Sequence, residues 1–140
     1  MERSQVLSQA SSARTRQSLI VELTGLHNCK GVVNVALFAS ANGFPSDPNQ
    51  AIRSGSFPID AIPFEIELPA LPCGRYAITV HHDENMDGQL NCNALGIPKE
   101  GIGFSGNPQI WRGVPAFQKA AFDLTPDHNF VSITMKYLLR

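Results

Sequence analysis

The 140-residue sequence is poor in charged and aromatic residues, and none of its apolar runs approaches the length needed to cross a membrane. Charged residues make up only 16%, and 11 Lys and Arg nearly balance 12 Asp and Glu. This balance argues against nucleic-acid binding, which needs clustered basic side chains. Hydrophobic residues nevertheless reach 43%, too many for a disordered chain. The composition therefore predicts one globular domain, rich in turns because it has 11 Gly and 10 Pro.

The first 17 residues differ in composition from the rest. They are rich in Ser and Gln and carry three Arg against one Glu, so the formal charge of −1 divides into +2 for this segment and −3 for the remainder. The segment lacks the apolar stretch of a secretory signal peptide. We expect residues 1–17 to be a disordered leader or a mature N-terminal extension, and residues 18–140 to form a single β-sandwich domain.

Apolar residues recur at alternate positions in much of the remaining chain, which is the period of a half-buried β-strand. Phe64, Ile66 and Leu68, for example, alternate with two glutamates. The expected strands cover residues 19–24, 32–38, 64–68, 75–82, 120–124 and 131–139. The first two are expected to pair across the connection between them. The pattern predicts an all-β fold, an antiparallel immunoglobulin-like or prealbumin-like sandwich of about seven strands with one long structured loop.

That long loop, residues 83–115, contains the most specific motif of the chain. Residues 83–88 read Asp-Glu-Asn-Met-Asp-Gly and match the opening of a calcium-binding loop, in which oxygen-bearing side chains alternate and a glycine allows a sharp turn. Calcium prefers such an all-oxygen set, whereas zinc prefers Cys and His. The expected Ca²⁺ ligands are Asp83, Asn85, Asp87, Gln89 through its backbone carbonyl, Asn91 and Asn93.

The motif departs from a calcium loop at its twelfth position, where Ala94 stands in place of a bidentate glutamate. Asn93 or Glu100 is left to close the coordination, so a calcium site here should be weak. The alternative is an Asx-rich turn, in which the same side chains cap nearby backbone amides. The sequence leaves both interpretations open.

Two histidines directly before this loop, His81 and His82, raise the question of a transition-metal site. Neighbouring residues of a strand point to opposite faces, so the two histidines do not readily bind one ion. His82 continues the inward face of its strand, and we expect it to end the core by donating a hydrogen bond to a loop carbonyl or carboxylate. The residues therefore favour calcium over a transition metal.

The segment after the acidic loop, residues 95–111, has too many apolar side chains for a solvated loop. We expect it to pack as a lid over one edge or end of the sheets. Aromatic residues of this region could instead form an exposed ligand-binding patch. The candidate patch residues are His82, Phe104, Trp111 and Phe117. The sequence contains no nucleophile-elbow or zinc-protease helix motif, so we assign no catalytic residue and expect no enzyme activity.

Three cysteines leave the redox state open. Cys29 and Cys73 each stand just before an expected strand, so they could meet at one end of a sandwich and form a disulfide in an oxidising compartment. Cys92 would then remain as an odd thiol inside the acidic loop. In a reducing compartment all three would be small reduced residues.

One long string of residues resembles a known family. It runs from the strand at residues 76–78 through the acidic loop to a glycine-rich segment. Its residues are Tyr76-Ala77-Ile78, His82-Asp83-Glu84-Asn85, Asp87-Gly88, Leu90, Asn93, Leu95-Gly96-Ile97-Pro98-Lys99-Glu100-Gly101 and Gly103-Phe104-Ser105. The chain resembles the bacterial domain of unknown function 2141 family over roughly residues 19–139.

This resemblance implies a small secreted or periplasmic β-sandwich, usually made with a signal peptide and without an established activity. Many members carry Asp where this chain has Asn91, so an ion site shared by the family would be less charged here. We expect a non-catalytic extracytoplasmic domain whose loop 83–93 binds calcium weakly and orders residues 95–111. The alternative is a ligand-binding or adhesion module that recognises a glycan, a peptide or a cell-envelope component.

Overall fold

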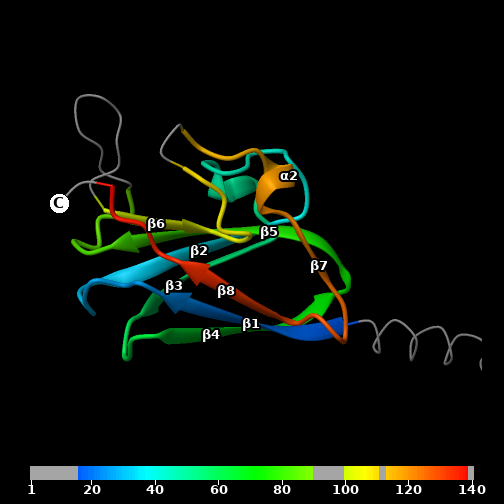
Figure 1. Ribbon diagram of the computed structural model, residues 1–140, viewed down its shortest axis with the longest axis horizontal. Coiled ribbons are helices and arrows are strands. Elements are labelled where there is room, and N and C mark those ends of the chain that lie inside the picture. Colours follow the sequence, from blue (N-terminus) through cyan, green and yellow to red (C-terminus); the bar gives the residue numbers. More distant parts are fainter. Residues whose placement is uncertain (1–15, 90–99, 111–112, 139–140) are drawn as a thin grey trace, which may run out of the picture.

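A computed structural model describes residues 16–89, 100–110 and 113–138, and these residues form eight strands and two short helical segments (Figure 1). In chain order the elements are β1 Arg16–Thr24, β2 Val32–Phe38, η1 Pro48–Gln50, β3 Arg53–Pro58, β4 Phe64–Pro72, β5 Gly74–Asp83, β6 Gly101–Phe104, α2 Phe117–Ala120, β7 Phe122–Leu124 and β8 Phe130–Thr134. The first two residues of β1, Arg16 and Gln17, belong to the segment expected to be a leader, whose first 15 residues lie outside the described part.

The strands form two sheets that face each other. One has the order β4-β1-β8, and the other has the order β3-β2-β5-β6, with β7 paired to the beginning of β5. The pairs are antiparallel except β1 with β8, which run parallel from Ile20 opposite Phe130 to Thr24 opposite Thr134. The expected all-β sandwich is therefore confirmed.

The main core lies between the two sheets and follows the alternation of the sequence. In β4, Phe64, Ile66 and Leu68 are buried while the glutamates between them are exposed, as the pattern predicted. The opposite sheet contributes alternate residues of β2 and β5, such as Val33 and Ile78, which are completely buried. Each such side chain contributes roughly 1.5–3 kcal/mol on burial, so this layer dominates the stability of the fold.

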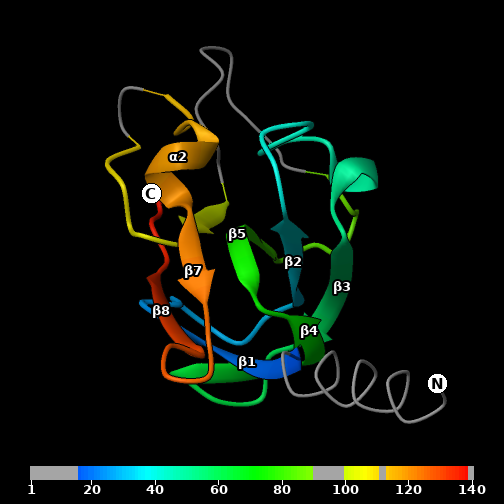
Figure 2. The ribbon, with the colours of Figure 1, turned by 90° about the vertical axis from the view of Figure 1, so that its right-hand side faces the viewer.

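A second, smaller core covers part of the other face of the larger sheet. Ile102 and Phe104 of β6 pack with Ala77, Ile110 and Ala120. Figures 1 and 2 show α2 lying over this outer face, on the side away from β1 and β4. Among the described residues, this second core covers the part of the sheet around β5 and β6 and contains no residue of β3.

Two expectations about pairing and loops were wrong. β1 and β2 do not pair with each other, because residues 26–31 carry the chain from one sheet to the other. β1 pairs instead with β4 and β8, and β2 pairs with β3 and β5. β3 and β6 lie in segments that were expected to be loops. Their sequences, RSGSFP and GIGF, are short and rich in Gly and Ser, so they lack the alternation that marks a half-buried strand.

The sequence left the redox state of Cys29 and Cys73 open; the disulfide between them is not formed, and both residues are free cysteines. Cys29 precedes β2, whose residue Val32 lies opposite Asp83 at the end of β5, whereas Cys73 precedes Gly74 at the beginning of β5. The length of β5 therefore separates them, roughly 30 Å at about 3.3 Å per strand residue, and a disulfide needs Cα atoms within about 7 Å. Cys92 lies outside the described residues.

No helix in the described ranges has the length and apolar character needed to cross a lipid bilayer.

Candidate functional site

A groove of about 460 Å³ lies on the outer face of the larger sheet. Its floor is built from small or polar side chains at outward positions, among them Asn34 and Ala36 of β2, Ser54 and Ser56 of β3, and Thr79 of β5. These residues share one face because paired residues of neighbouring strands lie on the same side of a sheet, as Asn34 does with Ser56. The second core stops short of β3, and small side chains leave the remaining face hollow.

Three other segments form the walls of the groove. The connection between β2 and β3 contributes Pro45, Ser46 and Pro48, and Val114 stands at the rim with 69% of its surface exposed. In the same connection, the carboxylate of Asp47 accepts the backbone N–H of Asn49 at 3.1 Å and caps η1. Ile102 and Phe104 of β6 also line the groove. The volume falls within the usual size of small-molecule sites.

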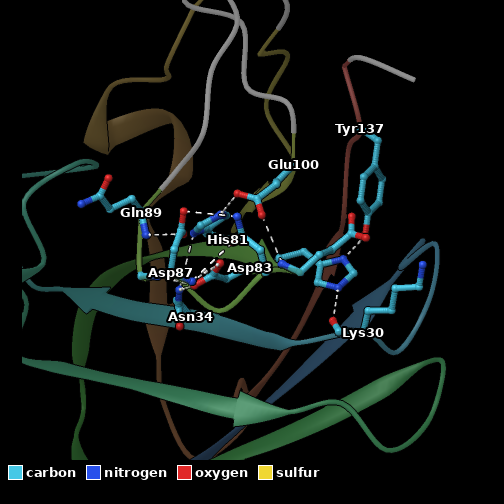
Figure 3. A network of polar contacts seen from close by, with 12 residues as sticks. Lys30, Asn34, His81, Asp83, Asp87, Gln89, Glu100 and Tyr137 are labelled. Carbon is cyan, nitrogen blue, oxygen red and sulfur yellow. Dashed lines mark hydrogen bonds and ion pairs between the residues drawn. The ribbon is translucent and has the colours of Figure 1, made fainter.

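An acidic cluster lies at one end of the groove, around His81 (Figure 3). His81, Asp83 and Glu100 each offer one ligand atom within 4.8 Å of the others. His81 and Asp83 share one face of β5, and Glu100 directly precedes β6, which pairs with β5. The Nε2 atom of His81 lies 2.9 Å from Oε1 of Glu100. The side chains of His81 and Glu100 are only 16% and 10% exposed, and Asp83 is 1% exposed.

The carboxylate of Asp83 organises the turn that follows β5. It accepts the backbone N–H of Gly88 at 2.8 Å and that of Asp87 at 3.3 Å, and it also accepts Nδ2 of Asn34 at 3.2 Å. Further along, Oδ1 of Asp87 accepts the N–H of Gln89 at 2.9 Å. These are the contacts of an Asx-rich turn, and they fix the carboxylates of Asp83 and Asp87 against the backbone of this turn.

The structure places four of the six expected calcium ligands. Asp83, Asn85 and Asp87 lie in this turn, where Nδ2 of Asn85 donates to Oδ2 of Asp87 at 3.3 Å, and Gln89 follows directly. Asn91 and Asn93 lie outside the described residues. The structure thus describes the first four ligand positions of the motif, all within residues 83–89.

His82 points away from the groove, into the space between the sheets, and is completely buried. Its Nε2 lies 2.8 Å from the carbonyl oxygen of Lys30, and its Nδ1 lies 2.7 Å from the hydroxyl of Tyr137. A carbonyl only accepts, so Nε2 carries a hydrogen, and in the neutral ring Nδ1 accepts the Tyr137 hydroxyl proton. His82 therefore ends the core and donates to a loop carbonyl, as the sequence predicted.

The exposed aromatic patch is not formed by the residues that the structure describes. His82 is buried, Phe104 is 6% exposed, and the two belong to opposite faces of the larger sheet. Phe117 is half-buried, with its ring 5.8 Å from that of Phe44. Burial against other aromatic and apolar side chains explains the difference for these three residues. Trp111 lies outside the described residues.

The sequence did not predict most of the residues that form the groove floor. Asn34 carried a usable signal, because it is the one polar residue in the apolar run of β2 and stands at an outward position. Ser54 and Ser56 carried none, since their strand was not recognised. The pairing of His81 with Glu100 depends on β6, which was also not recognised.

Tyr137 joins the C-terminal segment to the buried histidine and offers a test of this contact. Burial raises the pKa of Tyr137, the backbone N–H of His27 opposes this shift, and the negative charge of Glu84 adds to it. Because the folded pKa exceeds the unfolded value of about 10, the contribution to stability is complete below pH 10 and is lost as the pH rises through the folded pKa.

We therefore expect the stability difference between wild type and Tyr137→Phe to narrow between pH 8 and pH 11. Urea unfolding at both pH values measures this difference. Burial also raises the pKa of Tyr76, so the stability difference between wild type and Tyr76→Phe should narrow over the same pH range. This variant is a positive control, because Tyr76 lies outside the network of His82. A constant gap across the range would contradict the buried role of the Tyr137 hydroxyl.

A family model described as an uncharacterised protein conserved in bacteria, domain of unknown function 2141, matches residues 21–132. The chain belongs to this family. The match runs from β1 into β8 and includes the strands that carry the groove, so the expected membership in the domain of unknown function 2141 family is confirmed. Comparisons with curated proteins and with solved structures gave no match.

Proposed function

We propose that this member of the family is a non-catalytic, extracytoplasmic binding domain whose groove takes a small molecule with an apolar body and one hydrogen-bonding end. The observation that carries the proposal is the groove itself, a hollow of about 460 Å³ on a sheet face that is otherwise covered. The face over β2 and β3 carries small and polar side chains between apolar walls, and a concave surface of this kind is a natural place for a ligand.

The chemistry of the lining supports a ligand of this kind. Apolar walls come from Pro45, Pro48 and Val114, while polar groups are concentrated along the floor. The Ser56 hydroxyl donates to Oδ1 of Asn34 at 2.6 Å, which fixes the amide beside the acidic end of the groove. A few fixed polar groups among apolar walls give orientation to a small ligand, and the apolar area supplies affinity.

The same lining supports a non-catalytic role. Among the described residues that line the groove, His81 is the one titratable side chain. General acid–base or nucleophilic catalysis usually needs a second group that exchanges a proton with the first at the substrate. Glu100, the carboxylate bonded to His81, also accepts the backbone N–H of Glu84 at 3.2 Å, which is a positioning contact.

Binding of three probes tests this function: benzyl alcohol, methyl α-glucoside and the tripeptide Ala-Val-Ala. We expect benzyl alcohol to bind most tightly by ligand-observed NMR, and Ser54→Trp, which fills the floor, to abolish binding. Glu65→Trp is the matched control, because Glu65 is exposed on β4 in the other sheet. If the glucoside or the peptide binds more tightly than benzyl alcohol, the groove takes a glycan or a peptide instead of a small apolar molecule. Binding that survives Ser54→Trp would contradict the groove as the site.

The extracytoplasmic location rests on the resemblance to secreted or periplasmic members of the family. Cell fractionation of the protein expressed from its own gene tests it. We expect the protein in the periplasmic or culture fraction, and recovery with the cytosol would contradict the location. A partner in the cell envelope would fit the same location.

Weak calcium binding by the 83–89 turn is a second candidate function. It is favoured by the closeness of Asp83, Asn85 and Asp87 within one turn: the backbone N–H of Asp87 donates to Oδ1 of both Asp83 and Asn85, and Nδ2 of Asn85 donates to Oδ2 of Asp87. We expect millimolar calcium to raise the melting temperature and EDTA to reverse the rise, because an ion that binds only the folded state stabilises it. Asp87→Asn should remove the effect, whereas Asp127→Asn, at an exposed turn, should keep it. A melting curve that does not respond to calcium would contradict this candidate.

A further inference from the structure

We propose that His81, Asp83 and Glu100 form a site for a divalent transition-metal ion of the zinc class. The site goes beyond the proposed ligand groove and does not depend on it, although His81 also lines the end of that groove. It shares Asp83 with the calcium motif but differs from it in the other two ligands, an imidazole nitrogen and a carboxylate that precedes β6.

The fold brings the three side chains together from two neighbouring strands. His81 and Asp83 are two residues apart on β5, so they point to the same face, and His82 between them points to the other. β6 pairs with β5 from His82 opposite Gly101, which places Glu100 one step further, beside Asp83. The ligand atoms already lie within 4.8 Å of one another, so small side-chain movements bring them around one ion.

The electrostatics of the cluster favour a cation. Two carboxylates lie within 4.8 Å of each other in an environment that is 1% exposed at Asp83 and 10% exposed at the Glu100 side chain. Like charges held this close in a buried place repel each other. Even with His81 protonated, the formal charges of the three side chains sum to −1. A divalent ion bound to neutral His81 would offset both carboxylate charges.

The donor set selects the class of ion. Calcium and magnesium prefer oxygen alone, whereas one imidazole with two carboxylates suits zinc and its first-row neighbours. Three protein ligands leave further coordination positions for water or for a donor atom of a molecule in the groove. This arrangement is common where an ion also contacts a ligand.

Neighbouring groups hold the donors in place. Nδ2 of Asn34 donates to Oδ2 of Asp83 at 3.2 Å, which fixes this carboxylate beside the imidazole of His81. The N–H of Glu84 holds the second oxygen of Glu100 at 3.2 Å. Groups of this kind orient metal ligands, and their loss typically weakens affinity about 10–100-fold.

Metal titration of the untagged full chain tests the site. We expect isothermal titration calorimetry to show one Zn²⁺ per chain, with calcium in excess failing to displace it. Co²⁺ should give visible absorption bands of a mixed nitrogen and oxygen site. His81→Gln and Glu100→Gln should each weaken Zn²⁺ binding by at least about 10-fold, and Asn34→Ala should weaken it about 10-fold through orientation.

Two controls separate this site from other zinc ligands in the chain. His128→Gln, at an exposed turn, and Cys29→Ser, at an exposed loop residue, should bind Zn²⁺ as the wild type does. If a ligand variant does not fold, NMR of the wild-type protein tests the site instead. Zn²⁺ should shift the ring signals of His81 and leave those of His128 unchanged. Absence of Zn²⁺ binding, or binding that His81→Gln leaves unchanged or Cys29→Ser removes, would show that the three side chains form only a structural hydrogen-bond network.

Discussion

His82→Ala should lower the free energy of unfolding by about 3–5 kcal/mol, one of the two largest effects expected in this chain. The substitution removes a completely buried ring and leaves a cavity between the sheets. It also removes the hydrogen-bond partners of the Lys30 carbonyl and the Tyr137 hydroxyl. Lys30 lies in the connection between the sheets and Tyr137 lies beyond β8, so His82 fastens both segments to the end of β5.

Urea unfolding followed by circular dichroism measures this effect. His128→Ala is the control, because that ring is exposed and the change should stay within about 0.5 kcal/mol. Tyr137→Phe removes one hydroxyl, and its loss of unfolding free energy should lie between those of the two histidine variants, at about 1–3 kcal/mol. If His82→Ala and His128→Ala unfold at the same urea concentration, His82 does not hold these segments together.

Gly31→Ala should destabilise the fold by about 2–4 kcal/mol, because it combines a strained backbone with a clash. Gly31 has a φ of +66°, a backbone conformation that residues other than glycine rarely adopt. A Cβ atom there would lie 2.1 Å from the carbonyl oxygen of Asp83 and 2.7 Å from that of Glu84. Both are backbone atoms, so the two segments must separate to admit a methyl group.

Gly88→Ala is a closely matched control for this prediction. Gly88 has a similar φ of +76°, but a Cβ atom there would have no neighbour within 4 Å among the residues that the structure describes. Gly88→Ala should therefore lose only the free energy that the backbone strain costs, about 1–2 kcal/mol. Equal losses in the two variants by urea unfolding would mean that residues 26–31 do not pack closely against the end of β5.

The sequence predicted those parts of the fold in which a single strand shows its own alternation. β4 and β5 were found in this way, as was the inward position of His82, because a strand period of two assigns each residue to a face. Pairing between strands does not follow from that pattern, so β1 and β2 were wrongly joined. The long run of matching residues around the acidic loop was specific enough to indicate the family.

The candidate site could be predicted only in part, since it depends on contacts between strands. The turn that begins at Asp83 was visible as a motif, because its residues are consecutive. The groove was not, because its floor depends on β3, a strand of Gly and Ser with little apolar character. The proximity of His81 to Glu100 depends in the same way on the register of β6, and 18 residues lie between the two in the sequence.

Backbone amide NMR shifts of the wild-type protein during titration with benzyl alcohol test the central claim most directly. The claim is that the hollow outer face of the larger sheet is the binding face. The account predicts that the largest shifts fall on β2, β3 and β5, at Asn34, Ser56 and Thr79. Largest shifts on β4 or β1 in the opposite sheet, or no shifts at saturating probe, would contradict it.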